Sequence, residues 1–218
     1  MQPYLSPLEM LYHWEKNNPE KLYMRQPIND VWHKWSWAET ALQVRKMAAY
    51  LKSQDLEPNS KIAILSKNCA HWIMTDLAIM MAGHVSVPLY PNLKADSIAQ
   101  ILDHSQTKLV FVGKLDDFES MKGGIPSDMA CITYPFYSIE GYPLWDDLIK
   151  DVEPLTEDII REPSDLATII YTSGTTGMPK GVMHKFYNFS FSTSNAVPLL
   201  DLKDEARFFS YLPLCHIA

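Results

Sequence analysis

Apolar and polar residues along the chain form blocks that predict short buried strands separated by helices. Three apolar runs, Ile62–Leu65, Val85–Leu89 and Leu109–Val112, have the length of strands, and the first is continuous, as in a strand covered on both faces. Between them, the segment that Asn68 is expected to cap and the segment Ala95–Ser105 carry apolar residues at helical spacing. Strands and helices that alternate in this way indicate an α/β fold with an open, largely parallel sheet and helices on both faces.

The residues before this sheet predict a helix, a hairpin and a second helix. Leu5–Asn17 has the pattern of a short peripheral helix, and Leu22–Arg25 and Val31–Trp35 flank an Asn-Asp turn. Ser36 opens the sequence Ser-Trp-Ala-Glu, which is a capping box, and apolar residues then recur at helical spacing as far as Leu51. We therefore expect an N-terminal β-hairpin followed by an amphipathic helix.

The pattern is weaker between Gly113 and Pro163 and becomes regular again afterwards. We expect a first α/β subdomain over residues 1–163, and a loop with the start of a second subdomain over 164–218. The remaining predicted elements are strands at Ala130–Ile132, Leu166–Tyr171, Val182–Lys185 and Ala206–Leu212, and helices at Leu144–Ile149 and Phe186–Leu199.

The loop between the strands that end at Tyr171 and begin at Val182 carries the candidate chemistry. With its flanking residues it reads Tyr-Thr-Ser-Gly-Thr-Thr-Gly-Met-Pro-Lys-Gly and contains three of the eight glycines in the chain. Glycine lets the backbone approach a ligand closely, and successive N–H groups in such a turn form a concave anion site. The hydroxyl groups add hydrogen-bond donors, and Lys180 adds a positive charge. This combination favours a polyphosphate ligand.

Several common enzyme motifs are absent. The loop has Pro-Lys-Gly where a Walker A motif needs Gly-Lys-Ser/Thr, so an ordinary P-loop nucleoside triphosphatase is disfavoured. The sequence contains no Gly-x-Ser-x-Gly elbow, which disfavours a serine hydrolase. The seven histidines form no His-x-x-x-His pair, so no protein-held metal site is indicated.

The loop resembles the signature loop of the adenylate-forming (AMP-binding) superfamily, which includes acyl-CoA synthetases, luciferases and peptide-synthetase adenylation domains. Leu212–Ala218 resembles the next conserved segment of that superfamily, which lies beside the acyl-substrate pocket. Lys61–Asn68, Asp76–Ala78 with the preceding Trp72, and Val87–Pro91 also resemble the superfamily, most closely its long-chain fatty acyl-CoA synthetases. These last stretches have the character of structural elements.

The resemblance implies a reaction in two steps. A fatty-acid carboxylate attacks the α-phosphorus of Mg·ATP to give an acyl-adenylate and pyrophosphate, and the thiolate of the co-substrate CoA then displaces AMP. His216 is implied as a substrate-binding residue, with Thr175 and Thr176 at the β- and γ-phosphates and Thr176 and Lys180 as catalytic residues. The implied nucleotide-binding residues are Thr172, Ser173, Gly174, Thr175, Thr176, Gly177 and Lys180.

The resemblance extends from about Leu5 to the end of the chain but covers only the first part of the superfamily's length. The glutamate-bearing segment for Mg²⁺, the ribose-binding aspartate, the hinge and the C-terminal domain with its catalytic lysine have no counterpart here. We therefore expect the chain to be the first part of a large N-terminal domain and to be inactive alone. Two alternatives stay open: an enzyme that adenylates an aryl, amino or short-chain acid, and a non-catalytic nucleotide-binding module.

The composition of the chain limits the classes of binding partner and the cellular compartment that we expect for it. The net charge of -7 disfavours a nucleic-acid partner, because nothing neutralises a row of phosphates. The three cysteines show no paired spacing, which indicates reduced thiols and a cytoplasmic location. The longest apolar stretch, around Trp72 to Ala82, is too short for a transmembrane segment, although peripheral membrane contact stays open. The sequence does not indicate an oligomeric state.

Overall fold

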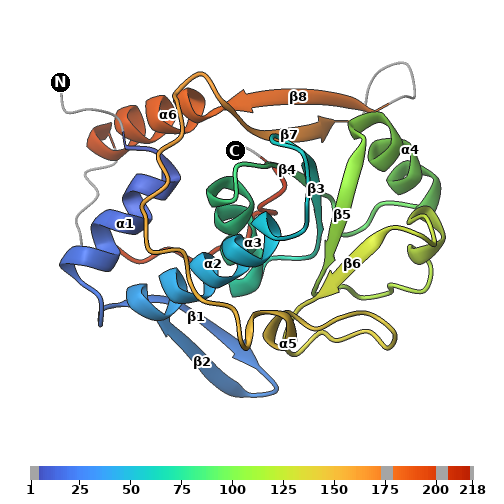
Figure 1. Cartoon of the computed structure of the whole chain (residues 1–218), viewed down its shortest axis with the longest axis horizontal. Coiled ribbons are helices and arrows are strands. Elements are labelled where there is room, and N and C mark those ends of the chain that lie inside the picture. The colour runs from blue at the N-terminus through green and yellow to red at the C-terminus, as the bar shows by residue number, and fades with distance from the viewer. Residues whose placement is uncertain (1–4, 173–178, 200–205, 217–218) are drawn as a thin grey trace.

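The computed structural model describes residues 5–172, 179–199 and 206–216 (Figure 1). In this part of the chain a two-stranded hairpin stands beside a six-stranded sheet. The elements in chain order are α1 (Pro7–Asn17), β1 (Leu22–Ile28), β2 (Val31–Ser36), α2 (Trp37–Lys52), β3 (Lys61–Leu65), α3 (Ala70–Met81), β4 (Val85–Leu89), α4 (Ala95–Ser105), β5 (Thr107–Val112), the 3₁₀ turn η1 (Lys122–Gly124), β6 (Ala130–Thr133), α5 (Trp145–Ile149), β7 (Leu166–Thr172), β8 (Lys180–Lys185) and α6 (Phe186–Leu199).

The six-stranded sheet has the strand order β6-β5-β3-β4-β7-β8. The first five strands in this order are parallel, and β8 pairs with β7 in the antiparallel direction at one edge. The predicted open, largely parallel sheet with an N-terminal hairpin is therefore confirmed. The predicted boundary between residues 163 and 164 stays a prediction, and β7, which follows it, joins the same sheet through β4.

Helices cover both faces of this sheet, as the sequence predicts. Alternate residues of a strand point to opposite faces, and in β3 Ile62 and Ile64 belong to one apolar cluster while Ala63 and Leu65 belong to the other. The first cluster lies under α1, α2, α3 and α5, and the second lies under α4. The sheet is thus the central layer of three.

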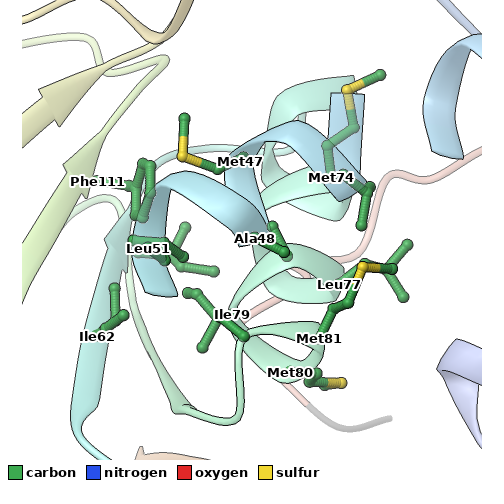
Figure 2. Packing of buried hydrophobic residues seen from close by; sticks show 14 of the residues in the cluster. Met47, Ala48, Leu51, Ile62, Met74, Leu77, Ile79, Met80, Met81 and Phe111 are labelled. Atoms are coloured by element: carbon green, nitrogen blue, oxygen red, sulfur yellow. The ribbon is translucent and has the colours of Figure 1, made fainter. Parts of the chain in front are cut away.

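The α2–α3 pair forms the centre of the larger cluster. Figure 2 shows Met47, Ala48 and Leu51 of α2 directed toward α3 and the sheet, with Phe111 of β5 closing one side. All four side chains are 0% exposed. Burying a side chain of this size contributes roughly 1.5–3 kcal/mol, so this layer holds α2 and α3 in fixed positions on the sheet.

Capping boxes define where α1 and α2 begin. In α2 the Ser36 N–H donates to Glu39 Oε2 at 2.7 Å, and the Glu39 N–H donates to Ser36 Oγ at 3.1 Å. Ser6 and Glu9 make the same pair of bonds at the start of α1. The box predicted at Ser36 is therefore confirmed.

The segment between α5 and β7 runs back across α1 and α2 (Figure 1) and is held there by polar contacts. The Arg45 guanidinium on α2 pairs with Glu15 at 2.7 Å and with Asp158 at 2.6 Å, and it also donates to the Leu155 carbonyl at 3.2 Å. These contacts tie the segment that leads into β7 to the helical layer.

Two local predictions are wrong. Residues 206–212 form no strand, because they have no ladder partner among the described residues and adopt irregular backbone. The N-cap residue of α3 is Cys69, whose side chain makes no capping bond, so Asn68 does not cap this helix.

Candidate active site

The candidate site lies at the carboxyl edge of the parallel strands, where β3 and β4 end side by side. The connection from β3 to β4 contains α3 on one face, and the connection from β4 to β5 returns past β3 through α4 on the other face. Loops that leave adjacent strands toward opposite faces create a crevice, and ligands of open α/β sheets bind at this point. Strand β7 is parallel to β4 and ends at the same edge.

The signature loop joins β7 to β8 at this edge. Thr172 and Lys180 are directly opposite each other in the last pair of the antiparallel ladder, so their side chains share one face. Both are exposed, and no carboxylate in the described ranges pairs with Lys180. The other candidate loop residues lie outside the described residues: Ser173, Gly174, Thr175, Thr176 and Gly177.

The base of this loop is fixed from behind by Tyr171. Its hydroxyl is hydrogen-bonded to His104 Nδ1 of α4 at 2.7 Å, and its side chain is 5% exposed. The facing residue is Gly181, where an added Cβ would stand 2.8 Å from Ile169 Cγ2 and 3.1 Å from Tyr171 Cζ. A larger residue at this position would therefore push against the Ile169 side chain and the Tyr171 ring. Sequence reasoning missed His104, for which no local signal exists.

The second candidate segment, residues 213–216, lies at the ends of β3 and β4. The His216 ring stands edge-on to Tyr90, which directly follows β4, with ring centroids 6.4 Å apart. His216 is exposed, whereas Cys215 is 2% exposed. Burial raises the pKa of the Cys215 thiol to about 11, so this cysteine stays protonated at neutral pH and is not a nucleophile. The structure thus brings Tyr90, which sequence reasoning did not assign to the site, beside His216.

An ion pair lies at this edge. Lys67, in the turn after β3, forms an ion pair with Asp116 from the loop after β5. No group of three His, Cys, Asp or Glu side chains that could hold a metal ion occurs within the described ranges. None of the described helices is long and apolar enough to cross a bilayer.

The edge therefore combines two chemical features from distant parts of the chain. At the base of the β7–β8 turn, the exposed Thr172 hydroxyl and the Lys180 ammonium, which pairs with no carboxylate of the described residues, suit an anion. Residues 213–216 supply an exposed imidazole at the crevice between β3 and β4. An anionic ligand that lies across the end of the sheet could contact both.

Comparison with known proteins decides the family. The profile of the AMP-binding enzyme family matches residues 11–218, which is nearly the whole chain. The chain belongs to the AMP-binding enzyme family. The resemblance inferred from the loop and from residues 212–218 is therefore confirmed.

Similar curated proteins are long-chain acyl-CoA synthetases. Long chain acyl-CoA synthetase 4 of Arabidopsis thaliana is 31% identical over 226 residues, a match that covers 92% of this chain and 33% of that protein. The long-chain-fatty-acid--CoA ligase FadD15 of Mycobacterium bovis is 28% identical and covers 95% of this chain and 36% of that protein. The chain therefore spans about a third of the length of these AMP-binding relatives.

Solved structures of AMP-binding enzymes share the fold. A putative long-chain-fatty-acid CoA ligase from Rhodopseudomonas palustris superposes with a TM-score of 0.82 at 20% identity, over 99% of this chain and 53% of that one. The o-succinylbenzoate coenzyme A synthetase of Bacillus subtilis in complex with AMP gives a TM-score of 0.76 at 23% identity, over 97% of this chain and 50% of that one. At these identities the likeness establishes the fold of the N-terminal part of an adenylate-forming enzyme.

Proposed function

We propose that the chain forms the nucleotide-binding part of an AMP-forming acid–thiol ligase that converts a fatty acid to its CoA thioester. The observation that carries this proposal is the placement of the signature turn. It leaves β7 at the carboxyl edge of the sheet, beside the crevice between β3 and β4, and it re-enters the sheet at exposed Lys180. Fatty acid as the substrate class is supported by the names of the relatives, which are long-chain acyl-CoA synthetases.

In this proposal the β7–β8 turn binds the triphosphate of ATP. Lys180 and the hydroxyl of Thr176 are the proposed catalytic groups, because hydrogen bonds from an ammonium and a hydroxyl would stabilise the charge that develops on the leaving pyrophosphate. Charge-assisted hydrogen bonds of this kind contribute about 1.5–3 kcal/mol each. The other proposed binding residues of the turn are Thr172, Ser173, Gly174, Thr175 and Gly177.

This arrangement suits a reaction that needs no strong base. A carboxylate is already ionised at neutral pH, so its attack on the α-phosphorus is limited by the approach of two anions and by the stability of the leaving group. Those are problems of positioning and electrostatics. Lys180 offsets negative charge at the turn, and His216 is proposed to contact the acid carboxylate or the adenylate.

The described residues do not supply a magnesium site. Mg²⁺ prefers carboxylate oxygens and water, and the described part of the chain holds no cluster of acidic side chains at this edge. No step is assigned to the metal here. The acceptor thiol of CoA, a cytoplasmic location and peripheral membrane contact remain predictions from the sequence.

The test is acid-dependent ATP–pyrophosphate exchange by the whole protein across fatty, aryl, amino and short-chain acids. We expect exchange with fatty acids, and we expect Lys180→Ala to lower it roughly 10–100-fold, which corresponds to one charge-assisted hydrogen bond. Lys185→Ala is the matched control, because Lys185 lies exposed at the far end of the same strand.

Normal exchange in Lys180→Ala would overturn the proposed role of the turn. Exchange with only aryl or short-chain acids would overturn the substrate class and keep the reaction type. ATP binding with no exchange for any acid would instead identify a non-catalytic nucleotide-binding module.

A further inference from the structure

The side chain of Asn68 makes four hydrogen bonds to a segment more than 140 residues away. Its Nδ2 group donates to the Leu212 carbonyl at 2.7 Å, to the Ser210 carbonyl at 3.1 Å and to Ser210 Oγ at 3.0 Å. Its Oδ1 atom accepts from the Leu214 N–H at 3.0 Å. One amide thus bonds to three residues of the segment that ends in His216.

The segment needs these bonds because it has few of its own. Residues 206–212 belong to no helix or strand, and Phe209 and Tyr211 are 86% and 73% exposed. Backbone N–H and C=O groups are almost always paired in folded proteins, and here Asn68 takes the place of a neighbouring strand. The amide provides donors on one atom and an acceptor on the other, which a carboxylate of the same shape does not.

The side chain of Asn68 does not cap α3, because another side chain already accepts a hydrogen bond from the first N–H group of this helix. Gln26 of β1 accepts a hydrogen bond from the Ala70 N–H at 2.8 Å, and its own amide nitrogen donates to Tyr137 Oη at 2.7 Å. The turn that carries Asn68 is also tied to the segment after β5, since the Lys67 N–H donates to the Lys114 carbonyl at 2.8 Å. The four bonds of Asn68 therefore start from a fixed point.

The bond to Leu214 lies two residues before His216. The His216 N–H donates to the Pro213 carbonyl at 3.0 Å, which closes a turn, and the Cys215 side chain within this turn is buried. The ring of His216 then stands beside Tyr90. The position of Leu214 thus determines where the imidazole lies at the end of β4.

We propose that Asn68 is a positioning residue that places His216 at the crevice between β3 and β4 for the acid substrate. This inference rests on the proposed function for its kinetic consequence, but the placement itself can be measured without activity. Among the residues that the structure describes, the side chain of Asn68 bonds to Ser210, Leu212 and Leu214 and to no residue of β7 or β8, so we expect its effect to be confined to the step that uses His216.

The experiment compares Asn68→Ala and Asn68→Asp in the whole protein, with Asn17→Asp as the matched control. Asn17 also donates through Nδ2 to a carbonyl, that of His13 at 2.7 Å, but it does so at the end of α1. Amide hydrogen exchange of the peptide over residues 206–216 reports the placement. We expect protection there to fall roughly tenfold in both Asn68 variants, because each lost hydrogen bond changes an equilibrium by about 2- to 10-fold.

Kinetics separate positioning from a general structural effect. We expect kcat for acid-dependent pyrophosphate exchange to fall about tenfold or more in both variants, with the KM for ATP unchanged. Because Asn68 acts through His216, the double variant Asn68→Asp with His216→Ala should be no slower than His216→Ala alone. Asn68→Asp keeps the shape of the side chain, so a purely steric role would leave it close to wild type.

Each outcome decides the proposal. Wild-type protection of residues 206–216 in both Asn68 variants would overturn it, and so would kinetic effects of Asn68→Asp and His216→Ala that multiply in the double variant. If wild-type protein shows no exchange with any acid, the proposed function fails. The hydrogen-exchange comparison then still decides whether Asn68 holds the segment.

Discussion

His71 lies in a box of aromatic side chains, and this environment predicts how the stability of the protein depends on pH. Its ring centroid on α3 is 6.0 Å from that of Trp35, 5.7 Å from that of Tyr134 and 5.5 Å from that of Trp145. The side chain is 5% exposed. Burial in this box lowers the pKa of His71 from 6.5 to about 4.

The sign and size of the effect follow from proton linkage. Above pH 6.5 His71 is neutral in both the folded and the unfolded chain. As the pH falls from 6.5 toward 4, the unfolded chain takes up a proton on His71 and the folded chain does not, so folding loses free energy. At about 1.4 kcal/mol per pH unit, the loss reaches about 3 kcal/mol near pH 4.

Replacing His71 with Phe keeps an aromatic ring and removes the titration. We expect the free energy of unfolding of His71→Phe, relative to wild type, to rise by about 1.4 kcal/mol for each pH unit below 6.5. Urea unfolding followed by tryptophan fluorescence between pH 7.5 and 4.5 measures this difference. Parallel curves for the two proteins would refute the reasoning, since they would mean that His71 takes up its proton equally in both states.

Asp76 lies on the same helix, and its titration should change the pH dependence of stability in the opposite direction. Burial raises the pKa of its carboxyl from 3.8 to about 6, against a lowering by the Ser86 hydroxyl. Between these values the folded chain holds a proton that the unfolded chain has lost, so Asp76 makes wild type more stable as the pH falls. As the pH falls over this range, the free energy of unfolding of Asp76→Asn relative to wild type should therefore decrease, whereas that of His71→Phe relative to wild type should increase.

Two further predictions concern the contacts that hold the layers together. Arg45→Ala should lower the free energy of unfolding by about 2–4 kcal/mol, because it leaves a partly buried carboxylate unpaired. Lys122→Ala removes one partner of an exposed ion pair and should lower it much less. Urea midpoints compare the two variants, and equal losses would contradict the assigned role of Arg45. Gly124→Ala should lower the free energy of unfolding by about 1–3 kcal/mol, because a Cβ there would stand 2.2 Å from a backbone oxygen of α4. In Gly123→Ala the added Cβ meets its nearest atom only at 4.0 Å, so the free energy of unfolding should stay within about 0.5 kcal/mol of the wild-type value. Similar thermal midpoints for the two glycine variants would show that η1 does not pack against α4 as described.

Most of the sheet could be predicted because its strands are apolar runs between helical patterns. The bounds expected for α4 are those observed, and the β7–β8 pair flanks the loop as expected. The strand expected at residues 206–212 failed for a physical reason. Its aromatic residues fit a strand pattern, but the backbone finds its partners in the amide of Asn68, which lies over 140 residues away.

The candidate site could be predicted only where its residues form one continuous motif. The turn from Thr172 to Lys180 is predicted in this way, and the roles of its residues stay a prediction. Tyr90 and His104 could not be predicted in this way, because each joins the site through a contact with a residue distant in sequence. Tyr90 contacts His216, and His104 contacts Tyr171. A polar residue beside a strand end is also ambiguous in sequence, and Asn68 looked like a helix cap for that reason.

The central claim is that the turn between β7 and β8 binds the triphosphate of ATP. A crystal structure of the whole protein with a non-hydrolysable ATP analogue tests it most directly. We expect the β- and γ-phosphates to lie against residues 173–178, with the Lys180 ammonium at hydrogen-bonding distance, about 3 Å, from a phosphate oxygen. A triphosphate bound elsewhere, with the turn packed against its own sheet, would contradict the claim.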